Sequence, residues 1–210
     1  MTNCKWVGIG ITITEGPLHT ASIEADKFLS TLYQSRKRFD HYEPHINLFD
    51  FDAPEDTHKA IQTRINKIAL ETLPIDIKAI EFDYFYFGLF FVKMVNSPQV
   101  LQLHEKIVRS LFQFKGNCVN GDYMNPIRNL NLIETGYRDK YGNPYIFENF
   151  HPHITVGHID PTRYDLESAK KELNLKINVA DMHYEVKTIH YAQNTEKGIV
   201  RIKYPKTAQS

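Results

Sequence analysis

Two stretches of the chain share the tripeptide Pro-His-Ile, EPHINL at residues 43–48 and HPHITV at residues 151–156. In both, a proline and a histidine are followed by alternating apolar and polar residues. Alternation of this kind is typical of a β-strand with one buried face. We therefore expect two similar strands, about half the chain apart.

Side chains two positions apart on a strand point to the same face. His45 and Asn47 therefore share one face of the first strand, and His153 and Thr155 share one face of the second. The apolar residues between them are expected in the core. Each strand thus presents an imidazole beside a hydrogen-bonding side chain.

The surroundings of the two stretches repeat as well. In each half, an amphipathic helix and then two β-rich runs follow the Pro-His-Ile strand, with roughly 30 residues from the histidine to the first run. This order predicts an α+β fold of two pseudo-symmetric lobes, each an antiparallel sheet with flanking helices, around a central cleft. We expect one domain over residues 1–210, with the halves divided near residues 115–150. The segment 115–150 has no clear hydrophobic periodicity, and we interpret it as a functional lid or as a segment that contains a hidden short helix.

Periodicity and turn residues locate the other elements. Helices are expected over residues 18–32, 61–69, 98–111 and 162–173, and strands over residues 5–14, 44–51, 75–82, 87–95, 153–159, 182–192 and 199–204.

Charge and cysteine content narrow the class of partner and compartment. The 25 Lys and Arg balance the 25 Asp and Glu, so no net charge attracts duplex nucleic acid or an anionic membrane. A small nucleotide or a strand end is a better match. Cys4 and Cys118 read as two isolated thiols of a reducing compartment, although one disulfide stays open. The sequence shows no signal peptide or membrane-spanning stretch, so we predict a cytoplasmic location. We also expect a monomer.

The duplicated motif resembles the His-x-Thr/Ser-x pair of the 2H phosphoesterase superfamily, which includes 2′-5′ RNA ligase-like proteins and 2′,3′-cyclic nucleotide phosphodiesterases. The resemblance covers most of the chain, because the lobe order and the placement of the motifs also agree. It implies that His45 and His153 are catalytic, that Asn47 and Thr155 bind phosphate, and that no metal or other cofactor takes part. Asn47 departs from the pattern, which has Thr or Ser there.

Elementary chemistry agrees with what the resemblance implies. Phosphoester cleavage needs one proton removed from the attacking oxygen and another delivered to the leaving oxygen. Histidine, with an ordinary pKa near 6.5, can do either at neutral pH. Amide and hydroxyl groups two positions on can donate hydrogen bonds to the non-bridging oxygens.

Three alternatives remain open at this point. In a nucleotide- or RNA-end-binding module, Asn47 in place of Thr or Ser would have abolished catalysis, and the protein would keep its affinity for the ligand without turnover. A metal-dependent hydrolase would use His151 and His153, although His158 has the opposite strand parity. A structural or interaction protein would have coincidental histidines.

Further side chains are secondary candidates. Tyr84 and Tyr86, in an aromatic run, are candidates for stacking on a base, with core packing as the plainer interpretation. Others that could contact phosphate or a base are Arg128, Arg138, Tyr123, Tyr137, Tyr141, Arg201 and Lys203.

Overall fold

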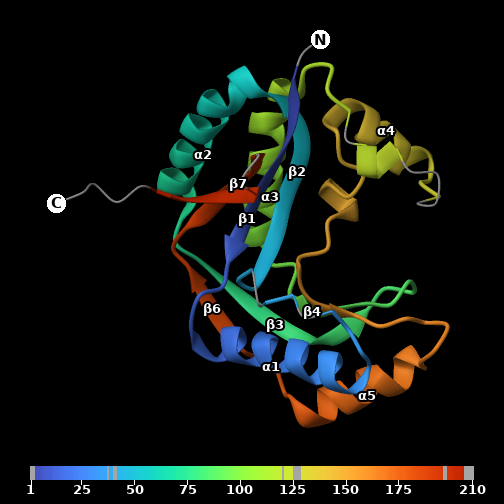
Figure 1. Ribbon diagram of the computed structural model, residues 1–210. Coiled ribbons are helices and arrows are strands. Elements are labelled where there is room, and N and C mark those ends of the chain that lie inside the picture. The colour runs from blue at the N-terminus through green and yellow to red at the C-terminus, as the bar shows by residue number, and fades with distance from the viewer. Residues whose placement is uncertain are drawn as a thin grey trace.

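The computed structural model describes residues 3–36, 38–39, 42–119, 121–124, 129–195 and 198–205 (Figure 1). Within these ranges the strands are β1 (Cys4–Thr12), β2 (His45–Pro54), β3 (Ile75–Tyr84), β4 (Leu89–Met94), β5 (His153–His158), β6 (His183–Val186), β7 (Ile189–Thr195) and β8 (Gly198–Tyr204). The α-helices are α1 (Gly16–Leu32), α2 (His58–Thr72), α3 (Pro98–Leu111), α4 (Leu132–Tyr141) and α5 (Leu166–Lys176). The predicted α+β class is confirmed.

The described strands form one sheet in the order β6-β3-β4-β5-β2-β1-β7-β8, with antiparallel neighbours. The two motif strands, β2 and β5, are neighbours at its centre and pair through Ile46 and Ile154. We expected a separate sheet in each lobe. That part of the expectation is corrected, because the two motif strands pair edge to edge in one sheet.

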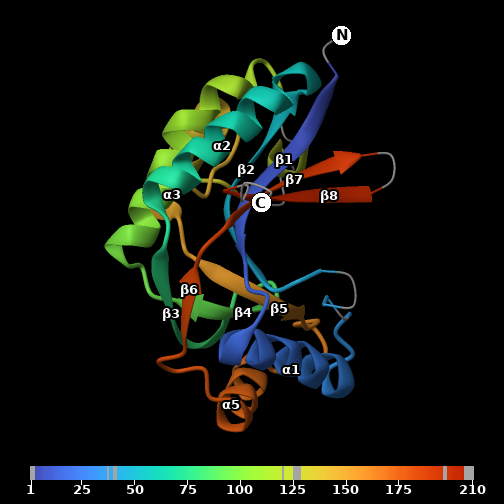
Figure 2. The same ribbon diagram turned by 90° about the vertical axis from the view of Figure 1, so that its left-hand side faces the viewer.

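The two halves of the sheet do not correspond to the two halves of the chain (Figure 2). As expected, α2 is followed by two strands, β3 and β4. Three described strands follow α5 instead of the two expected, namely β6, β7 and β8. However, β3 and β4 join the β5 side of the sheet, whereas β7 joins the β2 side. The strand expected over residues 182–192 is two strands, β6 on β3 and β7 on β1. The chain therefore crosses between the two sides after each motif.

Helices cover the sheet in two groups (Figure 1). Helices α1 and α5 pack on β5 and β3, and helices α2 and α3 pack on β7 and β2. The core between these layers is apolar, and each fully buried aliphatic side chain contributes about 1.5–3 kcal/mol. Its members include Val7, Ile9, Ile11, Ile46, Leu48, Ile154 and Val156.

Helix boundaries follow their caps. Ser97 accepts a hydrogen bond from the Val100 amide at 3.3 Å, and Pro98 begins α3, as predicted. The N-cap of α5 is Asp165 rather than Thr162, since the Asp165 carboxylate accepts from the Ser168 amide at 3.2 Å.

The segment 115–150 contains the hidden helix that we considered. Helix α4 begins with a reciprocal capping box between Asn131 and Glu134 and ends at Gly142, whose φ of 87° suits glycine. A disulfide joins Cys118, near the start of this segment, to Cys4 on β1. The expectation of two isolated thiols is therefore wrong, because the fold brings the two α-carbons to 5.9 Å. Across the described ranges, none of the helices has the length and apolar character that crossing a membrane requires.

Candidate active site

Pairing between β2 and β5 brings the two motifs together. The strands are antiparallel, and Ile46 is opposite Ile154. One step along in either direction, His45 is therefore opposite Thr155 and Asn47 is opposite His153. All four side chains lie on the face opposite to the two isoleucines, which are fully buried. The pairing thus brings two imidazoles, one amide and one hydroxyl to one face of the sheet.

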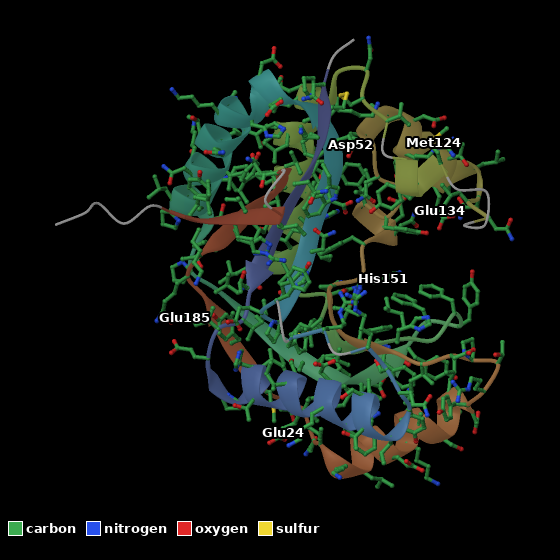
Figure 3. All side chains as sticks on the ribbon, viewed as in Figure 1. Glu24, Asp52, Met124, Glu134, His151 and Glu185 are labelled. Atoms are coloured by element: carbon green, nitrogen blue, oxygen red, sulfur yellow. A yellow bond between two sulfur atoms is a disulfide. The ribbon has the colours of Figure 1, made fainter. Side chains whose placement is uncertain are left out.

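Both imidazoles are held in the same way. His45 Nδ1 donates to the carbonyl of Glu43 at 2.9 Å, and His153 Nδ1 donates to the carbonyl of His151 at 2.7 Å. A carbonyl only accepts, so Nδ1 carries the proton in both rings. Nε2 is therefore the atom left to exchange a proton with a substrate. His151 lies near the centre of the molecule (Figure 3).

The environment disfavours the charged form of both histidines. Burial lowers the pKa of His45, and the positive charges of Arg201 and Arg38 lower it further. Burial likewise lowers the pKa of His153, and the charges of His151 and Arg38 lower it further. Each imidazole is consequently neutral to a lower pH than a free histidine.

Aromatic rings surround the second histidine. The His153 ring lies 5.1 Å from that of Phe91 and 5.5 Å from that of Phe85, between centroids. Tyr84, a stacking candidate from the sequence, is on the other face of the sheet, because its neighbour Asp83 pairs with Phe91 and Phe91 pairs with Thr155. There it stacks on Phe90 and donates to Glu167 on α5.

Tyr86, the other stacking candidate, is 79% exposed and contacts the ring of Phe87. Phe85 and Phe91, which the sequence did not single out, are the rings next to the site. The aromatic run at residues 82–87 was the available signal, but alternation alone did not show which of its members faced the histidine.

A different arrangement lies beside the first motif. Asn47 Nδ2 donates to the carboxylate of Asp50 at 2.7 Å, and Asp50 is buried. The same carboxylate accepts hydrogen bonds from Tyr123 and Asn143, both in the segment 115–150. This segment, which the sequence could not place, is therefore attached directly to the first motif.

Cationic side chains approach the site along β7 and β8. Lys203 pairs with His190 and Arg201 pairs with Ala192, which puts both cations on the face that His190 shares with the motif. His190 lies across Gly10, where an added Cβ would be 2.6 Å from the His190 ring. Within the described residues, Arg201 and Lys203 form no ion pair with a carboxylate. Sequence parity could not decide which way these two side chains face.

His190 is a third histidine at this site, and the sequence assigned it no role. Its Nδ1 is 2.8 Å from the Thr12 hydroxyl, and its ring meets that of His45 edge-on at 6.0 Å. Burial lowers the pKa of His190 to about 3, helped by the charges of His45, Arg201 and Lys203. A neutral imidazole beside several cations is typical of a place that receives an anion.

Several secondary candidates lie elsewhere. Tyr137 donates to Glu148, and Arg138 pairs with Asp139, both on the surface. Tyr141 is buried against Phe147 and Phe112. Arg128 lies outside the described residues.

One hollow of the molecule lies away from the four motif side chains. A hollow of about 450 Å³ is lined by residues of α3, α4 and the following loop, among them His104, Arg109 and Tyr137, and by no motif residue. Among the residues that the structure describes, no three His, Cys, Asp or Glu side chains gather as metal ligands do. The central cleft stays a prediction.

The sequence model of the 2′-5′ RNA ligase superfamily matches residues 22–196, which include both motif strands. The chain belongs to this superfamily. A protein of Geobacillus kaustophilus that is named a putative phosphoesterase is 28% identical over 173 residues, which cover 78% of this chain and 79% of that protein.

Solved structures of this superfamily's fold extend the comparison. TT0787 of Thermus thermophilus matches with a TM-score of 0.63 at 15% identity, over 95% of this chain and 96% of its own. E. coli LigT, solved with 3′-AMP, matches with a TM-score of 0.58 at 11% identity, over 97% and 100%. At such identities the likeness establishes the fold. The membership in a phosphoesterase family rests on the sequence matches.

Proposed function

We propose that this chain is a metal-independent phosphodiesterase that acts on a cyclic nucleotide, a 2′-5′ linkage or an RNA end. One observation carries the proposal: two imidazoles on adjacent strands have the same Nδ1 anchor, so each has Nε2 available for a substrate. A pair with this arrangement can act on opposite sides of one phosphorus atom. The complex of LigT with 3′-AMP supports a small nucleotide as the kind of ligand.

The reaction needs both imidazoles in different protonation states. One neutral histidine removes a proton through Nε2 from the attacking water, whose oxygen forms a bond to phosphorus. The other, protonated, donates its Nε2 proton to the leaving oxygen as that phosphoester bond breaks. Hydrogen bonds from Asn47 and Thr155 stabilise the charge on the non-bridging oxygens.

Local charge explains how an overall neutral chain would attract a phosphate. Arg38 and Arg201 are near enough to lower the pKa of His45 through their charges, and Lys203 acts in the same way on His190. Attraction of this kind raises the local concentration of an anionic substrate without a net charge on the protein. A small ligand that reaches this face is favoured over a long duplex.

A second candidate function is a nucleotide-binding module without turnover. The observation that favours it is the hydrogen bond from Asn47 to Asp50, because that bond already uses one of the two amide hydrogens. The cytoplasmic location and the monomeric state also remain proposals.

The deciding experiment is an assay of 2′,3′-cyclic nucleotides and 2′-5′-linked dinucleotides in the presence of EDTA. Wild type, His45→Ala and His153→Ala are compared, and the product isomer is identified. We expect turnover by wild type that both substitutions abolish. Retention of wild-type turnover by either variant would refute the two-histidine mechanism, and chelator-sensitive turnover would refute metal independence. Stabilisation by the same ligands without any turnover would establish the binding module.

The pH profile of kcat/KM is a further check on the same assay. The pKa values of His45 and His153 are both lowered from 6.5. The general acid therefore loses its proton below pH 6.5, so kcat/KM should be highest on the acid side of that value and fall as the pH rises. A profile that rises through neutral pH would contradict these roles.

A further inference from the structure

The proposed chemistry does not use the carboxylate of Asp50, which lies beside the first motif. Asp50 follows Asn47 by three positions on β2, and only 5% of it is exposed. A buried carboxylate is costly unless it is well hydrogen-bonded. Its partners therefore indicate what it does.

A β-bulge turns Asp50 toward the site face. Asn47 is opposite Gly10 and Phe49 is opposite Ile9, so Leu48 is an extra residue on β2. Asp50 is then opposite Gly8, which lies on the same face of β1 as Gly10. Asp50 and Asn47 consequently share a face, although an odd number of positions separates them.

Within the part of the chain that the structure describes, the donors to the Asp50 carboxylate include four side chains. Asn47 Nδ2 and Asn143 Nδ2 donate to Oδ1 at 2.7 and 2.9 Å, and the Tyr123 hydroxyl donates to Oδ2 at 2.9 Å. Trp6 Nε1 approaches Oδ2 at 3.4 Å. Hydrogen bonds to a charged acceptor are about twice as strong as neutral ones.

The carboxylate determines the orientation of the Asn47 amide. Because a carboxylate only accepts, Nδ2 must face Asp50, and a flipped amide would place two oxygens against each other. One N–H and Oδ1 of Asn47 remain for a ligand. The Thr or Ser of the family motif has no amide to orient, so this requirement is a consequence of the departure at Asn47.

We infer that Asp50 is a positioning residue for Asn47. Because Asp50 also accepts hydrogen bonds from Tyr123 and Asn143, the geometry of the first motif depends on how segment 115–150 packs against β2. Tyr123 precedes α4 in the sequence and Asn143 follows its C-cap, so residues on both sides of this helix are hydrogen-bonded to the same carboxylate. This inference rests on the proposed function, in which Asn47 contacts the phosphate.

A double-mutant cycle tests the inference. Asp50→Asn is measured with Asn47 intact and in the Asn47→Thr background, on whichever cyclic nucleotide wild type cleaves. With Asn47 intact, kcat should fall about ten-fold or more, since a misplaced group can cost about 100-fold. In the Asn47→Thr background the same change should alter kcat by less than about three-fold. Equal losses in both backgrounds would overturn the inference, because Asp50 would then act only as structural support.

A second cycle covers the case in which Asp50→Asn does not fold. Tyr123→Phe removes one donor and keeps the carboxylate, and it should lower kcat with Asn47 intact but not in the Asn47→Thr background. The matched control is Tyr137→Phe, which removes a hydroxyl that donates to Glu148 at 2.8 Å in the same segment. Equal effects of the Tyr123 and Tyr137 substitutions would contradict the inference.

A measurement without substrate separates this inference from the proposed function. The NMR signal of the Asn47 side-chain amide should shift in Asp50→Asn and stay unchanged in Tyr137→Phe. An unchanged signal in Asp50→Asn would overturn the positioning role whatever the turnover. Failure of the proposed function itself would instead be seen as equal turnover by wild type and His45→Ala.

Discussion

Strands β2 and β5 present their histidines with the same backbone anchor, but the residues that support the two motifs differ. Beside His153 on β5 are the rings of Phe85 and Phe91, from β4 and the turn before it. Beside His45 and Asn47 on β2 are the buried Asp50 and donors that lie 73 and 93 positions away.

This difference shows that one motif depends on a neighbouring strand of the sheet and the other on a segment outside the sheet. The second motif is completed by Phe91 on β4, which pairs with β5 within the sheet, and by Phe85 in the turn before β4. The first motif is completed only when segment 115–150 folds back onto β2. Conditions that loosen this segment should therefore affect β2 before β5.

The largest expected effect tests the common feature of the two strands. His45→Gln and His153→Gln should each lower kcat/KM by about 100- to 10,000-fold, the usual contribution of a general acid or base. The double variant should be little worse than the poorer single one, because the two act as a unit. Steady-state kinetics on folded protein measures this. Strictly multiplicative losses would show that the two strands work independently.

The next effect concerns acid stability and separates the two strands. His104 is buried and uses both nitrogens: Nδ1 donates to the carbonyl of Leu48, the bulge residue, and Nε2 accepts from the Phe147 amide. Burial lowers the pKa of His104 to about 4. Between pH 6.5 and about 4 His104 binds a proton in the unfolded chain but not in the folded chain. Its contribution to the free energy of unfolding therefore falls as the pH drops, by up to about 3 kcal/mol, in addition to the contributions of the other buried histidines.

Urea unfolding between pH 7 and pH 4 measures the total loss, and His104→Gln should make it smaller by the contribution of His104. Amide hydrogen exchange should show segment 115–150 and the β2 bulge opening before β5 as the pH falls. Simultaneous opening of the two strands would contradict the comparison.

The smallest expected effect concerns the aromatic support of β5. Phe85→Ala admits water beside His153, so the pKa of that imidazole should rise toward 6.5, while the pKa of His45 should not change. Titration of the two ring signals by NMR measures both values. Tyr84→Ala is the matched control, since Tyr84 lies on the other face of the sheet. A pKa shift of His153 in that control would refute the assignment of the rings.

The sequence by itself determined the local features of this protein. Strand parity correctly paired each histidine with its neighbour two positions on, because the side-chain period of a strand is a property of the backbone. Ser97 and Pro98 predicted the start of α3 for a similarly local reason. The repeated motif also pointed to the superfamily to which the chain belongs.

Only the tertiary structure decided how the two motifs meet and what surrounds them. Pairing of Ile46 with Ile154 joins strands 108 positions apart, and no local pattern specifies that partner. The bulge at Leu48 reverses the parity of every later residue on β2, so Asp50 faces the site although simple alternation places it on the other face. Long-range pairing and one extra residue are settled by packing of the whole chain, which is why the Asp50 cluster could not be found from spacing.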